Sequence, residues 1–255
     1  MKRVNQCLIL AAGNGSRIAS VAGGVPKPLV RLCGVPLLEH VMTSCAEAGV
    51  TEFVIVLGYR GDLIRRWFAE RSPEGVSVTL MDNPEYRRAN GVSALAAKEE
   101  LRGAFLLVMA DHIFEPRTAK ALLQQQIADD EVILAVDSKL DRVFDLDDAT
   151  KVQRVGNHVV AIGKDLPFYN ALDTGMFLCG PQLFTRLEFA RNKGNGDCSL
   201  SDGMRQLVRE QKLKAFDIGG AHWQDVDSPE ALTHAESVFD QNFSDNPVLH
   251  RLANV

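Results

Sequence analysis

A glycine-rich segment follows the first apolar run of the chain, and a lysine between two prolines lies ten residues after it. The segment reads Leu10, Ala11, Ala12, Gly13, Asn14, Gly15, Ser16 and Arg17. Small residues let the backbone approach a nucleotide closely, and its N–H groups can bind phosphate oxygens. Arg17 and Lys27 would add two positive charges. We predict a nucleotide-binding loop here, although a tight turn followed by a surface lysine is the simpler alternative, and the chain lacks the GK[ST] that a P-loop requires.

Carboxylates occupy two places where strands are predicted to end. Asp111 follows Phe105–Ala110, the most apolar stretch of the chain, and Asp225 and Asp227 lie two residues apart on an extended segment. Residues two apart in an extended segment point to the same side. Together these three side chains predict a site for Mg²⁺, a hard cation that prefers oxygen ligands. Capping of the following helices is the alternative role, and Ser228 and Pro229 are expected to begin the last helix.

Short apolar segments and helical patterns alternate six or seven times along the chain. Strands are expected at 4–10, 52–58, 76–80, 105–110 and 131–136, and helices at 35–48, 62–70, 92–101 and 116–127, with Asn90 as a helix cap. Such alternation predicts an α/β fold with a Rossmann-like, mostly parallel sheet and helices on both faces. Ligands bind at the carboxyl ends of strands in such sheets. Loops 11–27, 81–93 and 110–115 should therefore converge on one cleft.

The pattern changes after residue 138. A hairpin is expected at 152–163, a strand at 173–179, helices at 182–192 and 200–211, a strand ending at 223–227, and a helix at 229–242. We predict a single domain over residues 1–243, with a nucleotide-binding part at 1–138 and a smaller acceptor-binding elaboration at 139–243. Residues 244–255 are expected to form a C-terminal tail.

Composition excludes several classes of protein. The chain has 255 residues, of which 46% are hydrophobic and 24% charged, with a formal net charge of −5. These values are typical of a globular protein and argue against nucleic acid as a partner. No apolar run approaches the roughly 18–20 residues that span a bilayer. Five cysteines without metal-ligand spacing indicate reduced thiols. We expect a cytoplasmic protein without stable membrane insertion. The oligomeric state is left open, and a homodimer is one of the alternatives.

The glycine loop and the Pro26–Leu29 segment resemble those of the nucleotidyltransferases that activate sugar phosphates and phospho-alcohols. The resemblance implies that residues 10–16 wrap the nucleotide, that Arg17 holds the β- and γ-phosphates, and that Lys27 holds the α-phosphate. It assigns Asp111 to Mg²⁺ with Asp225 or Asp227 as the second ligand. Arg17, Lys27 and Asp111 are thus the expected catalytic residues. Apart from the resemblance, His112 follows Asp111 directly in the sequence, and we expect it to orient Asp111.

Two further segments gain a role through this resemblance. Asn83–Ser93 occupies the place of the family's base-reading loop, and its N-x-x-S pattern is similar to that of cytidylyltransferases. Ser93 and the neighbouring backbone are expected to read cytosine, and Asn83 and Asn90 are expected to bind the nucleotide. Helix capping is the alternative role for Asn90 and Ser93. On the acceptor side the resemblance implies contacts from Lys164, Tyr169, Asp173, Thr174 and Gly175.

Taken together, the motifs resemble the cytidylyltransferases that act on inositol 1-phosphate, over about residues 4–238. The resemblance implies Mg²⁺-dependent in-line transfer of CMP from CTP to the acceptor phosphate, giving CDP-inositol and pyrophosphate. Phosphocholine, a phosphonate and a sugar 1-phosphate remain alternative acceptors. A glycosyltransferase of related fold would carry D-x-D at the end of the central strand, whereas that strand is followed here by Asp111, His112 and Ile113. A regulatory relative tends to lose the Arg, Lys or metal Asp, and all three are present here.

Overall fold

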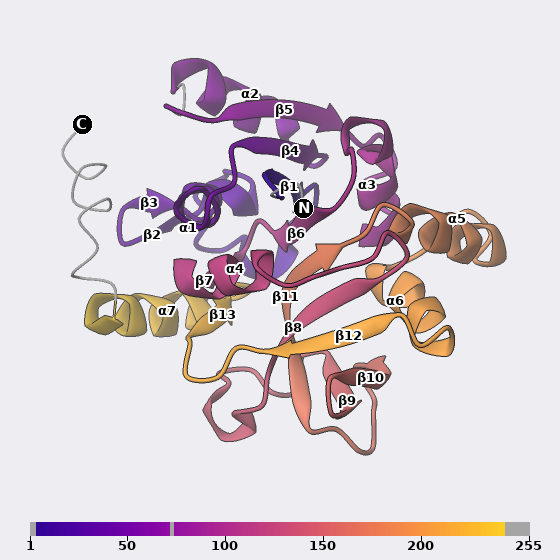
Figure 1. Cartoon of the computed structure of the whole chain (residues 1–255). Helices are drawn as coiled ribbons and strands as arrows, with labels where there is room; N and C mark the ends of the chain where they lie inside the picture. Colours follow the sequence, from indigo (N-terminus) through magenta and orange to yellow (C-terminus); the bar gives the residue numbers. More distant parts are fainter. Residues whose placement is uncertain (1–3, 72–73, 243–255) are drawn as a thin grey trace.

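The computed structural model describes residues 4–71 and 74–242, and its centre is one mixed sheet. Within these residues the sheet has the order β5, β4, β1, β6, β11, β8, β12, β10, β9 (Figure 1). The corresponding bounds are Ser77–Asp82, Glu52–Leu57, Gln6–Ala11, Phe105–Met109, Ala171–Cys179, Val132–Asp137, Leu213–Asp217, His158–Gly163 and Lys151–Val155. Strands from both sides of residue 138 therefore share one sheet.

Parallel pairing dominates the first half of the sheet. Strands β5, β4, β1 and β6 pair in parallel, as do β8 and β12. Strand β11 runs antiparallel to both β6 and β8, and the predicted hairpin is present as the antiparallel pair β9–β10. The expected parallel sheet with an elaboration in the second half is thus confirmed, with β11 joining the two parts.

Helices cover both faces of the sheet, as expected. On one side lie α3 (Asn90–Ala96), α5 (Leu183–Lys193) and α6 (Leu200–Arg209). On the other lie α1 (Leu37–Ala48), α2 (Gly61–Glu70) and α4 (Pro116–Leu123). Because successive strand residues point to opposite faces, Leu8 and Leu10 of β1 pack with the first group, and Cys7 and Ile9 with the second.

A third, smaller cluster lies beside the main sheet. It joins α7 (Pro229–Asn242) to the two-stranded hairpin β2–β3 (Arg31–Leu32 and Val35–Pro36) through apolar side chains that include Leu32, Val226 and Ala235. A second small sheet pairs β7 (His112–Phe114) with β13 (Trp223–Asp225). No described helix is long and apolar enough to cross a membrane.

Most sequence-based expectations for individual elements are confirmed. Gly49 ends α1 with φ 108°, Pro116 begins α4, and the Ser228 hydroxyl accepts from the Ala231 N–H at the start of α7. Four helices are shorter than expected. Helix α1 begins at Leu37, because Val35–Pro36 form β3, and α6 ends at Arg209. Helix α3 gives way to a 3₁₀ turn at Lys98–Glu100, and α4 ends at Leu123. Strand β12 was not expected. The predicted tail, 244–255, lies outside the described residues.

Candidate active site

The site lies at the carboxyl ends of β1, β4, β5 and β6, where loops far apart in the sequence touch. The Tyr59 N–H donates to the carbonyl of Ala12, and a Cβ on Gly58 would overlap the Tyr86 side chain. The loops after β1, β4 and β5 are therefore packed against one another. On the other side of β1, the Val226 N–H donates to the carbonyl of Asp111 at 2.9 Å. The predicted convergence of the loops is found in the structure.

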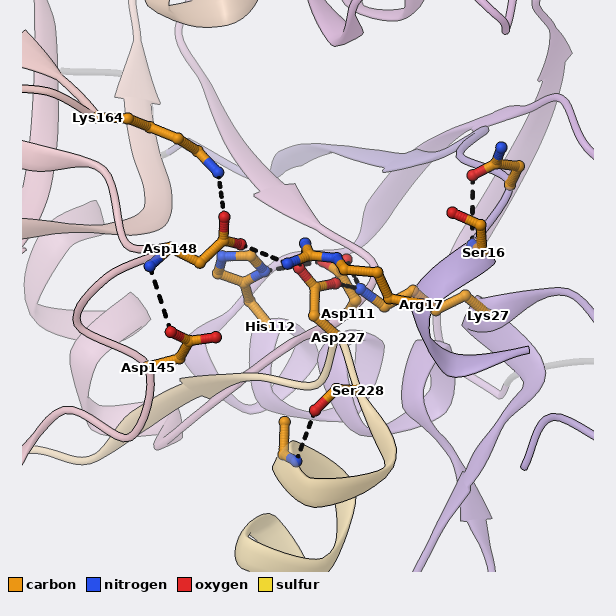
Figure 2. A network of polar contacts seen from close by, with 12 residues as sticks. Ser16, Arg17, Lys27, Asp111, His112, Asp145, Asp148, Lys164, Asp227 and Ser228 are labelled. Atoms are coloured by element: carbon orange, nitrogen blue, oxygen red, sulfur yellow. Dashed lines mark hydrogen bonds and ion pairs between the residues drawn. The ribbon is translucent and has the colours of Figure 1, made fainter. Parts of the chain in front are cut away.

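Lys27 is the most buried cation of the site. It begins the 3₁₀ turn Lys27–Leu29, is only 8% exposed, and pairs through Nζ with Asp111 Oδ2 and with Asp227 Oδ1 (Figure 2). The base of its side chain lies against Gly15, where a Cβ would lie 2.6 Å from Cβ of Lys27 and where φ is +58°. Only glycine fits both requirements. The glycine loop thus fixes the course of the chain at Lys27.

Arg17 and Lys164 are joined by a carboxylate that the sequence analysis did not single out. Asp148 Oδ2 accepts from Arg17 at 2.7 Å and Asp148 Oδ1 from Lys164 at 2.5 Å, while Arg17 also pairs with Asp227 (Figure 2). These hydrogen bonds hold the pKa of Asp148 below its usual value. The predicted nucleotide side and the predicted acceptor side are therefore linked by one side chain.

Asp111 is held by two partners. Lys27 contacts Oδ2, and His112 Nδ1 lies 2.8 Å from Oδ1. Burial raises the pKa of Asp111, but the charges of Lys27 and His112 outweigh burial and hold the pKa well below its usual range. Burial lowers the pKa of His112, whereas the charge of Asp111 raises it above its ordinary value. The expectation that His112 orients Asp111 agrees with this contact.

The carboxylates that could share a cation differ in one member from the expected set. Oxygens of Asp148, Asp225 and Asp227 lie within 4.8 Å of one another, the one such group of three found among the described residues. Asp225 and Asp227 are thus brought together as expected. Asp111 stands beside them through the Lys27–Asp227 pair, and its oxygens contact Lys27 and His112. The oxygens of Asp148 and Asp227 are likewise paired with cationic side chains.

The glycine loop divides into a buried and an exposed part. Leu10, Ala11 and Ala12 are buried, since they belong to or follow β1. Gly13, Asn14 and Ser16 are exposed, and the Asn14 side chain accepts from the Ser16 N–H at 3.4 Å. The exposed backbone of this loop is available to a ligand.

In the base-reading segment, Asn83 and Ser93 form one buried pair. The Asn83 amide donates to the Ser93 hydroxyl at 2.9 Å, and its own oxygen accepts from the Glu85 N–H. The expectation that Asn90 caps α3 is wrong: the cap position is Ala89, and the Asn90 oxygen accepts from the Leu200 N–H at 2.8 Å. Asn90 therefore ties this segment to α6.

On the acceptor side, the structure separates the predicted residues. The Thr174 side chain is buried, and its hydroxyl donates to the carbonyl of Ala135, so it is committed to the fold. Gly175, with φ +72°, lies directly against the His112 ring. Asp173 accepts from the Gly175 N–H, and burial raises its pKa to about 6. Tyr169 is half-buried on the same connection as Lys164.

Comparison with known proteins defines the class of this fold and site. A family model for the MobA-like NTP transferase domain matches residues 7–211, and the chain belongs to this family.

The chain is also similar to individual proteins with known names. The chain is 37% identical over 233 residues to a Rubrobacter xylanophilus protein named bifunctional IPC transferase and DIPP synthase, covering 90% of this chain and 51% of that one. A Thermococcus kodakarensis protein of the same name is 34% identical, with 90% and 49% covered. The chain thus spans about half the length of these curated relatives. The solved inositol-1-phosphate CTP transferase from T. maritima superposes with a TM-score of 0.79 at 27% identity, covering 94% of this chain and 98% of that one.

Proposed function

We propose that the chain transfers CMP from CTP to the phosphate of inositol 1-phosphate, giving CDP-inositol and pyrophosphate. One observation carries the proposal: a continuous set of ion pairs joins Lys27 to Arg17 through Asp227, and Arg17 to Lys164 through Asp148 (Figure 2). Such a cluster suits a reaction in which two anionic substrates must meet. The names of the relatives that span most of this chain support the same activity.

On the nucleotide side, the chain supplies positive charge where negative charge develops. Phosphate oxygens of CTP would replace carboxylate oxygens on Arg17 and Lys27. Lys27, being largely buried, would act on the α-phosphate in a region of low dielectric, where a charge is worth more than in water. With a net charge of −5 over the whole chain, these cations focus attraction on one place.

The donor set fits a magnesium ion. Asp148, Asp225 and Asp227 offer carboxylate oxygens close together, which is the chemistry that Mg²⁺ prefers, and Asp111 lies next to them. When bound, Mg²⁺ would supply charge that offsets the phosphates of the two substrates. We retain Asp111 with Asp225 or Asp227 as the proposed ligands and add Asp148 to them.

Base selection is assigned to the segment around Ser93. Because the Asn83 amide already donates to the Ser93 oxygen, the Ser93 hydroxyl proton is free to donate to another acceptor. Cytosine offers such acceptors at O2 and N3. A site whose buried groups match one base leaves them unpaired with another, and this mismatch discriminates strongly.

The acceptor side favours a polyol phosphate. Lys164 provides the cation for the phosphate, and Asp173 provides a carboxyl group for hydroxyls. A choline headgroup would need an aromatic cage. The 163–175 segment offers only Phe168 and Tyr169 for this purpose, and Phe168 is 76% exposed.

The reaction then needs little beyond positioning and charge. An oxygen of the acceptor phosphate attacks the α-phosphorus of CTP in line, the bond to the bridging oxygen breaks, and pyrophosphate leaves. The phosphate nucleophile is already ionised at neutral pH, so no general base is required. Lys164 orients the acceptor, and Lys27 and Arg17 stabilise the charge on the α-phosphate and on the leaving group.

Product identification by ³¹P NMR tests the proposal. Incubation with CTP, Mg²⁺ and inositol 1-phosphate should yield the paired resonances of a diphosphate diester together with pyrophosphate. Omission of the acceptor is the control, and CTP should then remain intact. Release of free phosphate or CMP without a diester would contradict nucleotidyl transfer.

A further inference from the structure

The imidazole of His112 lies against two rigid neighbours. One is Gly175, where a Cβ would be 2.6 Å from His112 Nε2 and would also overlap Cδ2. The other is the Trp223 ring, which stacks on the imidazole at a centroid distance of 6.1 Å and an interplanar angle of 19°. Trp223 is itself fixed, because its Nε1 donates to the buried Asp137 at 2.9 Å.

The backbone adds a further constraint on the same residue. His112 is paired with Asp225 in the antiparallel register of β7 and β13. The ring therefore has little freedom to turn, and Nδ1 faces Asp111 Oδ1 at 2.8 Å. An ionised carboxylate can only accept, so Nδ1 carries the proton of this hydrogen bond.

Asp111 in turn has one oxygen for each partner. His112 fixes Oδ1, which leaves Oδ2 turned toward Lys27. Without the imidazole, the carboxylate could rotate about its terminal bond, which is a soft torsion. Lys27 would then lose one of its two carboxylate partners at the place proposed for the α-phosphate and would keep Asp227.

We propose that His112 is a positioning residue that fixes the carboxylate plane of Asp111, and that Gly175 is required because it leaves room for the imidazole. This inference rests on the proposed function for its kinetic consequences. It gives Gly175 a role through His112, instead of direct contact with the acceptor.

Two substitutions separate hydrogen bonding from space filling. Asparagine places an amide nitrogen close to the position of Nδ1, whereas phenylalanine keeps a ring but has no donor. We expect His112→Phe to lower kcat about 10- to 100-fold, as is usual when the partner of a functional carboxylate is lost, with the KM values for CTP and inositol 1-phosphate nearly unchanged. We expect His112→Asn to keep kcat within about threefold of the wild type. His158→Phe, at an exposed histidine that begins β10, is the matched control.

Gly175→Ala tests the space around the ring. It should lower kcat about as much as His112→Phe does. In a His112→Ala background it should cost much less, because alanine has none of the Cγ, Cδ2 and Nε2 atoms that the new methyl group would meet. Gly156→Ala is the control for backbone strain, since Gly156 has φ +60° and nothing lies within 4 Å of the place that its new methyl group would take.

Crystal structures of the two His112 variants provide a readout that needs no activity. The Asp111 carboxylate should keep its orientation in His112→Asn and turn away in His112→Phe. The proposal would be overturned by a wild-type kcat in His112→Phe or by equal losses of kcat in the Asn and Phe variants. It would also be overturned if the Asp111 carboxylate kept its orientation in His112→Phe, or if the loss of kcat in Gly175→Ala did not depend on residue 112. A wild-type protein inactive toward every substrate would instead contradict the proposed function, and the crystal structures would still decide the role of His112.

Discussion

Lys27 and Asp111, 84 positions apart in the sequence, form an ion pair at the edge of the sheet. The pair joins the loop after β1 to the end of β6, and it is partly shielded because Lys27 is only 8% exposed. Because the pair is shielded from water, it holds the charge of Lys27 in a fixed position. A charge fixed before the reaction stabilises the charge that develops in the transition state.

Replacing Lys27 by alanine should therefore affect turnover more than binding. We expect kcat to fall by about 10² or more, because one preorganised charge contributes roughly 3 kcal/mol to the transition state. Steady-state kinetics with varied CTP provide the measurement. A rise in the KM for CTP with unchanged kcat would show that Lys27 binds ground state and transition state equally.

Gly15 should be intolerant of a side chain because of Lys27. Gly15→Ala would place a methyl group 2.6 Å from Cβ of Lys27, and we expect a fall in kcat of at least about tenfold, as for other displaced catalytic groups. Gly23→Ala is a matched control, since Gly23 has the same φ of +58° but no atom within 4 Å. Equal losses in the two variants would attribute the effect to backbone strain alone.

Lys164→Ala should act on the acceptor. Loss of one charged hydrogen bond predicts a rise of about 10- to 100-fold in the KM for inositol 1-phosphate, with little change in the KM for CTP. Lys98→Ala, which removes an exposed lysine paired with Glu188 at 2.8 Å, is the control and should change neither constant. A main effect on CTP would place Lys164 on the nucleotide side, where Asp148 already links it to Arg17.

Asp173 predicts a pH dependence of stability. Burial raises its folded-state pKa from 3.8 to about 6, so between these values the folded protein binds more protons than the unfolded chain. Its contribution to stability is therefore full at low pH and is lost as the pH rises through about 6. Asp173→Asn should raise the Tm at pH 8 by roughly 2–4 °C and by less at pH 5. Thermal melts across this range provide the test, and a larger gain at pH 5 would contradict the assignment.

Much of the nucleotide-binding side was predictable from local sequence. Glycine, proline and lysine at fixed spacing identify the loop around Lys27, and an acid after an apolar strand identifies Asp111, because these signals depend on neighbours in the chain. Strand β12 was not predicted, because LKAFD is short and its apolar and polar residues alternate only weakly.

Asp148 could not have been found in the same way. It lies in an irregular acidic stretch, and its partner Arg17 is 131 positions away, so only the folded chain shows their contact. The prediction for Asn90 was wrong for a similar reason. Its local sequence favours a helix cap, but its side-chain oxygen accepts a hydrogen bond from the Leu200 N–H, 110 positions away. Thr174 shows that a position on the right strand does not tell whether the side chain faces the ligand or the core.

The most direct test of the proposed activity is pyrophosphate release with two nucleotides and four acceptors. CTP and UTP would each be combined with inositol 1-phosphate, phosphocholine, 2-aminoethylphosphonate and glucose 1-phosphate in the presence of Mg²⁺. We predict the highest kcat/KM for CTP with inositol 1-phosphate. An acceptor that turned over at least about tenfold more efficiently, a difference of about 1.4 kcal/mol, would contradict the acceptor assignment. A preference for UTP would contradict the assignment of base reading to Ser93.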